Sequence, residues 1–301
     1  MQLAILFQVS EPSLDKQEIN LMKLLILATA AALSFTISTG SSLAASTKDV
    51  VRSAMTELMI KKNVNSIDMH FSEPYIQHNQ LIPSGLGGLK ELANQAIAKN
   101  PAFKYKLVRL IADGNVGIAH GVYEGFGEMP LVAFDVFKVE KGKIVEHWDN
   151  LSPIAANNPS GRSQTDGPVE VVDHDKTDAN KALVRDFVET VLIGGAFDKL
   201  PTYFDGNNYI QHNSNIADGL SGLQEGLQAL AKAGVTMKIA KIHKVLGEGN
   251  FVLAISEGDI SGNPTAFYDL FRVNNDKIVE HWDVISPILP AEKTANTNGK
   301  F

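Results

Sequence analysis

The feature that most constrains the fold of this chain is a set of motifs that occur twice. The pentapeptide Tyr-Ile-Gln-His-Asn begins at Tyr75 and again at Tyr209, and the heptapeptide Lys-Ile-Val-Glu-His-Trp-Asp begins at Lys143 and again at Lys277. Both pairs are 134 residues apart. Because separate motifs keep one offset, we interpret the pattern as a tandem duplication whose copies are each long enough to form a core.

The expected domains are residues 46–156, here called repeat one, and 179–290, here called repeat two. Residues 157–178 between them are rich in Asn, Pro, Ser, Gly, Thr and Asp, which is typical of a linker. Residues 291–301 have a similar polar composition, and we expect a flexible tail there.

Each repeat predicts an α+β fold. Residues 48–62 have apolar side chains at helical spacing, and a second amphipathic helix is expected after Gly85. Apolar alternating runs then predict strands at 104–112, 116–123, 131–140 and 143–151. Helices followed by an antiparallel meander indicate helices packed on one face of a curved sheet.

Composition excludes several classes of function. The net charge is -7, from 27 basic and 34 acidic residues, which does not suit a nucleic-acid-binding protein. The chain has no cysteine, which excludes disulfides, thiolate nucleophiles and Cys-ligated metals. No Gly-x-Gly-x-x-Gly motif follows a predicted strand, so a nucleotide cofactor has no support.

The N-terminal region predicts export. Residues 22–45 have a Lys, a short apolar stretch and small residues before Ala45, the layout of a signal peptide that leaves no membrane anchor after cleavage. Residues 1–21 carry acidic side chains ahead of this segment, and we interpret them as an upstream extension from a mis-assigned start. A buried N-terminal helix is the alternative. The expected location is periplasmic or secreted.

The repeated Tyr-Ile-Gln-His-Asn, Asp-[Val/Leu]-Phe-[Lys/Arg]-Val and Lys-Ile-Val-Glu-His-Trp-Asp motifs resemble the SnoaL-like family of the NTF2-like superfamily. The resemblance covers nearly all of both repeats. It implies two cone-shaped α+β barrels that pair through their sheets as an intrachain pseudo-dimer, with further self-association open. It also implies no metal and no organic cofactor, and relatives that include polyketide cyclases acting by acid–base aldol chemistry.

Asp135 and Asp269 are the leading catalytic candidates. Each begins a run of apolar neighbours, where a carboxylate is costly unless it is paired or its pKa is raised. The position matches the acid/base aspartate that the resemblance implies, although a structural aspartate at a strand end is the alternative. His120 lies on an apolar face and resembles the family's second polar pocket residue. Its counterpart is Ile255, so we expect repeat one to be the more competent catalyst.

The other candidates are histidines and their neighbours. His78 shares a strand face with Ile76, which favours an inward, carbonyl-orienting imidazole, or simply a satisfied core histidine. His147 and Asp149 share a face and can form either an acid–base pair or a structural hydrogen bond. No closely spaced ligand pair supports a metal. The residues expected to contact a ligand are His147, Trp148, Asp149, His212, His281, Trp282 and Asp283.

The leading hypothesis is therefore an exported protein that binds a small apolar or carbonyl-bearing molecule and acts on it by cofactor-free acid–base chemistry of the aldol or isomerase type. A non-catalytic ligand-binding or scaffold module is the main alternative. A hydrolase that uses the same carboxylate to activate water is the third.

Overall fold

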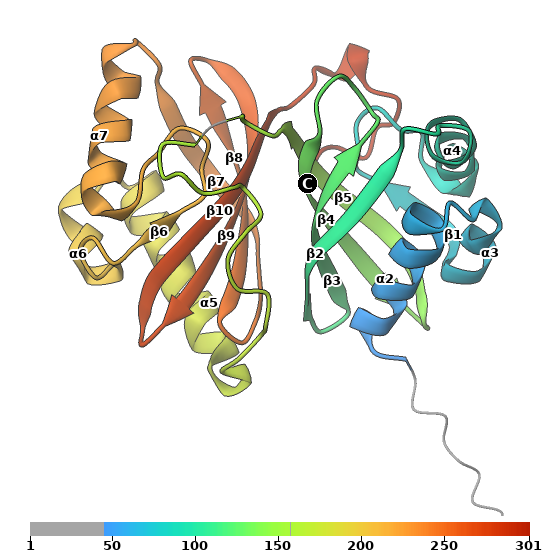
Figure 1. The fold of residues 1–301 in the computed structure, drawn as a ribbon, viewed down its shortest axis with the longest axis horizontal. Helices are drawn as coiled ribbons and strands as arrows, with labels where there is room; N and C mark the ends of the chain where they lie inside the picture. The colour runs from blue at the N-terminus through green and yellow to red at the C-terminus, as the bar shows by residue number, and fades with distance from the viewer. Residues whose placement is uncertain (1–44, 157) are drawn as a thin grey trace, which may run out of the picture. The chain divides into compact units, whose positions relative to one another are not determined.

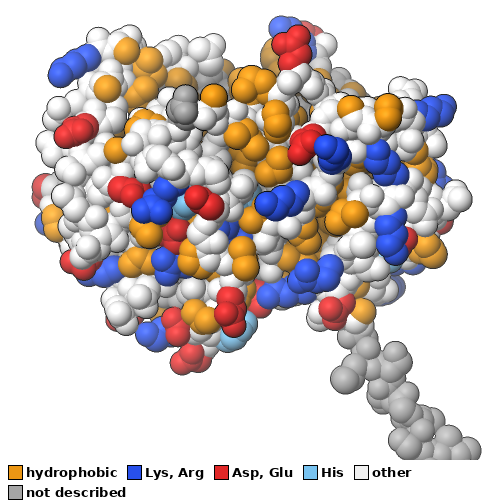
Figure 2. All heavy atoms as spheres, in the orientation of Figure 1, with side chains coloured by type: hydrophobic (Ala, Val, Ile, Leu, Met, Phe, Trp, Pro, Cys, Tyr) orange, Lys and Arg blue, Asp and Glu red, His pale blue; other side chains and the backbone are white. Residues whose placement is uncertain are grey.

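The computed structural model describes residues 45–156 and 158–301, which belong to one compact unit. The predicted upstream extension and signal segment, residues 1–44, lie outside the described residues. Two five-stranded sheets each have helices on one face, here called the inner face, which confirms the predicted α+β class (Figure 1). Figure 2 shows acidic and basic side chains interspersed over the visible face. In the described part of the chain, no helix combines the length and apolar character that crossing a membrane requires.

Repeat one begins with helical segments and ends with a sheet. Its helices are α2 (Thr47–Met55), which continues as a π-helical turn (Thr56–Ile60), a 3-10 turn (Val64–Ser66), α3 (Ile67–His70) and α4 (Gly85–Leu92), which continues as a second π-helical turn (Ala93–Ala98). Its strands are β1 (Phe71–Gln77), β2 (Lys104–Asp113), β3 (Val116–Glu124), β4 (Leu131–Glu140) and β5 (Lys143–Pro153).

Repeat two has the same order of elements. A 3-10 turn (His174–Lys176) precedes α5 (Thr177–Phe187) with its π-helical extension (Val188–Ile193), a 3-10 turn (Phe197–Lys199), α6 (Leu200–Tyr203) and α7 (Gly219–Lys232). The strands are β6 (Ile210–Gln211), β7 (Met237–Glu248), β8 (Phe251–Ile260), β9 (Asn263–Asn274) and β10 (Lys277–Pro287), and a 3-10 turn (Ala291–Lys293) follows.

The two sheets have equivalent strand orders, β1-β5-β4-β3-β2 and β6-β10-β9-β8-β7. The meander strands pair antiparallel as predicted, whereas β1 and β6 each add a parallel edge to the last strand of their sheet. In each sheet, the two edge strands do not pair with each other, so the sheet is open and the prediction of closed barrels is wrong. Helices cover the inner face of each sheet. The Tyr-Ile-Gln-His-Asn motif overlaps this extra edge strand, which ends at Gln77 in repeat one and at Gln211 in repeat two.

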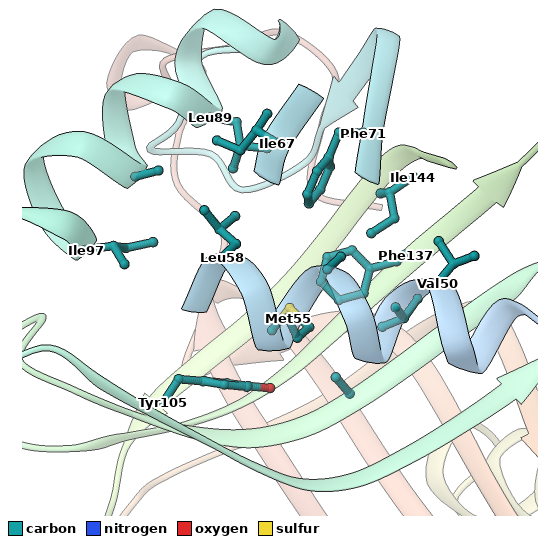
Figure 3. Packing of buried hydrophobic residues seen from close by; sticks show 14 of the residues in the cluster. Val50, Met55, Leu58, Ile67, Phe71, Leu89, Ile97, Tyr105, Phe137 and Ile144 are labelled. Carbon is teal, nitrogen blue, oxygen red and sulfur yellow. The ribbon is translucent and has the colours of Figure 1, made fainter. Parts of the chain in front are cut away.

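Helices and sheet form a buried apolar core in each repeat. At the start of α2, the Ser46 hydroxyl and the Asp49 carboxylate cap each other's backbone N–H groups, which fixes where the helix begins. In repeat one, α4 and its extension place Leu89 and Ile97 near Leu58 of the first helical segment (Figure 3). Side chains from the helices and from the sheet both contribute to this buried core of repeat one.

The outer faces of the two sheets meet in a third apolar cluster to which β2–β5 and β7–β10 both contribute. The Asn150 side-chain amide donates across this contact to the carbonyl oxygens of Val284 and Ala266, at 2.7 Å and 3.2 Å. Each sheet is therefore apolar on both faces, with helices on one side and the other sheet on the opposite side (Figure 1). This arrangement decides where each histidine lies.

The segments that follow β5 and β10 each cross to the other repeat. Asn158 donates to the carbonyl of His212 in repeat two, and Asn298 donates to the carbonyl of Gln77 in repeat one. Lys300 likewise donates to the carbonyl of Asp149, at 2.7 Å. The segment expected to be a flexible tail is thus held by hydrogen bonds, and the expected linker is held in the same way.

Candidate active site

Repeat two contains a cavity of about 600 Å³ between its helices and the inner face of its sheet. Its apolar walls include Phe187, Val191, Leu227, Ile239, Phe267 and Ile285. Side chains with polar groups also line it, and they include Gln211, Asn213, Asp269, His281 and Asp283. An apolar cavity with a few convergent polar groups is the usual form of a small-molecule site.

Asp269 and His281 form a buried pair at this cavity. His281 Nε2 lies 3.0 Å from Asp269 Oδ1, and His281 Nδ1 lies 2.9 Å from Gln211 Oε1. The backbone N–H of Asn213 also donates to Gln211 Oε1, so that oxygen is an acceptor and His281 Nδ1 must be the donor. One further proton is then shared between His281 Nε2 and Asp269 Oδ1.

The second oxygen of Asp269 is free. Oδ2 is buried, and no group in the described part of the chain donates a hydrogen bond to it. Burial by itself would lower the pKa of His281, but its hydrogen bond to Asp269 and the charges of Asp283 and Asp269 raise that pKa above its usual value. Asp269 therefore lines the cavity with one oxygen paired to a proton-holding imidazole and with the other oxygen without a donor among the described residues.

Asp283 lies beside this pair and accepts a hydrogen bond from the Asn213 amide. Burial raises the pKa of Asp283, which favours its protonated form over that of an exposed aspartate. Ligating atoms of Asp269, His281 and Asp283 lie within 4.8 Å of one another, as do those of Asp135, His147 and Asp149. Either set could therefore hold a metal ion by distance, although the sequence spacing did not predict one.

Repeat one has the same pair in a different setting. His147 Nε2 lies 3.1 Å from Asp135 Oδ1, and His147 Nδ1 lies 3.0 Å from Gln77 Oε1. The Tyr123 hydroxyl donates to Asp135 Oδ2 at 2.9 Å, so both carboxylate oxygens have partners. Burial raises the pKa of Asp135, and the hydrogen bond from His147 opposes that shift.

The tyrosine is what distinguishes the two sites. Tyr123 pairs with Leu131, and the equivalent pair in repeat two is Gly258 with Thr265. On the next strand, the neighbour of Tyr123 is Tyr105, whereas the neighbour of Gly258 is Ile239. Repeat two therefore lacks two phenol rings at sheet positions where repeat one has them.

The helices that cover the two sheets also differ: α4 and its extension pack closely in repeat one, and α7 packs less closely in repeat two. In repeat one, Leu89, Ala93 and Ile97 are 4%, 0% and 0% exposed. In repeat two, Leu223 and Leu227 of α7 are only half-buried and line the cavity. The helix of repeat two thus stands away from its sheet, and the space beneath it is the cavity.

Comparison with known proteins agrees with the family named from the motifs. Residues 51–147 match the family model of the SnoaL-like domain. Repeat one is a SnoaL-like domain. The search of curated proteins found no match.

Three solved structures match about a third of the chain at low sequence identity. TsrD from Streptomyces laurentii is 16% identical over 34% of this chain and 88% of its own, with a TM-score of 0.31. A putative polyketide cyclase from Bacillus cereus ATCC 10987 is 20% identical over 35% and 74%, with a TM-score of 0.32. A SnoaL-like polyketide cyclase from Agrobacterium tumefaciens C58 is 13% identical over 36% and 92%, with a TM-score of 0.31.

His120 of the SnoaL-like domain is not in the inner site. It stacks on Phe134 at 4.4 Å, and Arg109 Nη1 donates to its Nδ1 at 3.1 Å, on the sheet face that meets repeat two. Burial lowers the pKa of His120 well below its usual value, which suits a neutral acceptor. The predicted pairing of Asp135 with His120 is therefore wrong, because their side chains leave the SnoaL-like sheet on opposite faces.

His78 also lies on the side away from the core of the SnoaL-like domain. Its ring stacks on Trp148 at 4.8 Å, Nε2 lies 3.0 Å from Glu146 Oε1, and Nδ1 donates to the carbonyl of Gly299. The inward imidazole that the sequence predicted is wrong. His212 has the same surroundings in repeat two, where it stacks on Trp282.

The seven predicted contact residues therefore lie in three places: the two inner sites and the contact between the sheets. His147 and Asp149 lie with Asp135 inside the SnoaL-like domain, and His281 and Asp283 lie with Asp269 at the cavity. Trp148, His212 and Trp282 lie on the side where the sheets meet, away from both inner sites.

Two glutamines were missed by the sequence analysis. Gln77 and Gln211 hold the histidines His147 and His281 by their Nδ1 atoms. The signal was present, because Tyr, Gln and Asn alternate within the Tyr-Ile-Gln-His-Asn motif and so share one strand face. Reading that polar face as the inner one would have found them.

Proposed function

We propose that the chain binds a small, mostly apolar molecule in the cavity of repeat two and that Asp269 acts on it as an acid–base group without a cofactor. The observation that carries this proposal is that Asp269 lines an apolar cavity, with Oδ1 held by His281 and with Oδ2 buried and without a donor in the described part of the chain. A positioned carboxylate in a dry site is a suitable base for a weakly acidic C–H next to a carbonyl.

In the proposed step, Asp269 Oδ2 removes a proton from the carbon beside the carbonyl. The C–H electron pair moves to form an enolate, and the carbonyl oxygen gains negative charge. Asp283, whose pKa burial raises, is the nearby acid that can donate to this oxygen. The proton on Asp269 exchanges with solvent, a proton then passes from Asp269 to the same or another carbon, and the re-formed carbonyl returns to Asp283 any proton it donated, so the step is balanced without any co-reactant.

The test uses 2-decanone in deuterated water, with loss of the hydrogens beside the carbonyl followed by NMR. The folded protein is expected to accelerate this exchange, and Asp269→Asn is expected to reduce the protein-catalysed rate about 100- to 10,000-fold. Asp135→Asn is the matched control and should leave the rate nearly unchanged. Equal exchange by the wild type and Asp269→Asn, with both folded, would contradict the catalytic role.

A non-catalytic binding module is the second candidate, favoured by the largely apolar lining of the cavity. It predicts that 2-decanone binds in the cavity but exchanges no faster than in buffer. Binding can be measured separately by displacement of a fluorescent apolar probe.

We also propose that the two repeats form an intrachain pseudo-dimer. Arg109 of repeat one lies over the Trp282 ring at 4.2 Å, and Lys244 of repeat two lies over the Trp148 ring at 4.3 Å. This reciprocal pair supports the approximate two-fold relation. Sedimentation should give the mass of one chain, because the sheet faces already cover each other, and a dimer that exchanges these faces would contradict the proposal.

Export is a further proposal that depends on the sequence of residues 22–45 alone. Mass spectrometry of the native protein should find an N-terminus near Ala45 or Ser46. A mature chain beginning at Met1 would contradict it.

A further inference from the structure

The described side chains that line the cavity of repeat two include no lysine or arginine. Among the lining residues, which all lie in the described part of the chain, the side chains that can ionise near neutral pH are those of Asp269, Asp283 and His281. The two nitrogens of His281 are already engaged, by Gln211 and by Asp269. The cavity therefore offers no free cationic donor to a ligand.

An anionic ligand would meet an unfavourable environment there. A carboxylate transferred from water into an apolar cavity loses its hydration, and only a paired cation or several donors can offset that loss. Here Asp269 lines the cavity and would repel it, and the imidazole of His281 is already engaged by Asp269 and Gln211. Fatty-acid-like molecules with an ionised head should therefore bind poorly.

The free acceptor of Asp269 has the opposite preference. Oδ2 is buried without a donor in the described structure, and a buried acceptor without a partner is costly. A ligand that places an O–H or N–H group there removes that cost. Its apolar body would lie against α7 and the inner sheet face, where Leu227 and Ile239 line the cavity.

We propose that the natural ligand of this cavity is an apolar molecule whose polar end is a hydrogen-bond donor without negative charge, a hydroxyl or an amine, bound to Asp269 Oδ2. This inference rests on the site of the proposed function, but it concerns recognition and holds whether or not the bound molecule reacts. It assigns a specificity role to the same oxygen that would act as the base.

The experiment compares three probes of equal length, 1-decanol, decylamine and decanoate, as competitors of a fluorescent apolar probe on the full chain at pH 7. The alcohol and the amine should bind about tenfold more tightly than decanoate, or better. The order of the first two then tells whether the donor is a hydroxyl or an amine. Asp269→Asn should reduce the difference in affinity between decanoate and the other two probes, because it removes a negative charge and adds an amide donor.

The matched control is Asp135→Asn in repeat one, which should leave all three affinities unchanged, with thermal melting to show that each variant is folded. Equal or tighter binding of decanoate would overturn the proposal, and so would failure of all three to bind the folded wild type. Selective binding without exchange of 2-decanone hydrogens would uphold this inference while refuting catalysis.

Discussion

Repeats one and two have the same aspartate, histidine and glutamine in the same hydrogen-bonded order, yet they differ in what surrounds them. In repeat one, Tyr123 satisfies the outer oxygen of Asp135 and the helix packs down on the sheet. In repeat two, Gly258 stands at the position of Tyr123, so Asp269 Oδ2 has no donor among the described residues, and Asp269 lines a cavity. The shared residues make an acid–base pair, and their neighbours decide whether a ligand can reach it.

The largest expected effect on stability is at the contact between the sheets. Trp282 is fully buried, and its Nε1 donates to the carbonyl of Asp166, whereas Trp148 Nε1 has no partner among the described residues. Trp282→Ala should lower the free energy of unfolding by about 3–5 kcal/mol, and Trp148→Ala by less. Urea denaturation of both variants measures these losses. Equal losses of unfolding free energy would contradict the predicted difference between the two tryptophans.

The next prediction concerns the tyrosine that distinguishes the two sites. Tyr123→Phe leaves Asp135 Oδ2 buried without a donor, which should cost about 1–3 kcal/mol of unfolding free energy. Binding of 1-decanol in repeat two should not change. Unaltered stability of Tyr123→Phe would mean that the hydroxyl does not hold Asp135.

The arrangement of the two sheets explains which features could be predicted from the sequence and which could not. Period-two alternation placed the meander strands and put Asp135 and Asp269 on the face of Phe137 and Phe271, which is the inner face. It could not place His120 or His78, because each sheet is apolar on both faces and an apolar neighbour does not identify the inner one.

The cavity was beyond sequence analysis for a second reason. Its presence depends on which residue lies opposite another across neighbouring strands, and β7 and β8 shift register twice, between Ile239 and Lys241 and between Ile242 and Lys244. Such shifts move side chains between faces without any change in composition. The alternation in the Tyr-Ile-Gln-His-Asn run indicated a strand face, but it could not show that this strand pairs parallel with the last strand of the sheet, because alternation does not identify a strand's neighbour.

A smaller effect is expected from the C-terminal segment. Asn298 donates to the Gln77 carbonyl and to Ser84 Oγ, both at 2.9 Å. Asn298→Ala should lower unfolding free energy by about 1 kcal/mol and increase hydrogen exchange at β1, with no change at β6. Exchange that rises equally at both edge strands would show that the segment does not act on repeat one alone.

The smallest expected effect is the pH dependence from His281. Its pKa is raised in the folded protein, so its contribution to stability is full below the unfolded value near 6.5 and is lost as pH rises through the folded value. Unfolding free energy should therefore fall over that range in the wild type, and less so in His281→Gln. If unfolding free energy changed with pH to the same extent in both proteins, His281 would not be the source of the pH dependence.

The central claim, that the working site lies in repeat two, is tested most directly by a crystal structure with 10-bromo-1-decanol, in which anomalous scattering locates the bromine. The account predicts one molecule in the repeat-two cavity, with its hydroxyl in hydrogen-bond contact with Asp269 Oδ2 and its bromine among the apolar walls. A molecule bound beside Asp135 in repeat one, or between the two sheets with the repeat-two cavity empty, would contradict it.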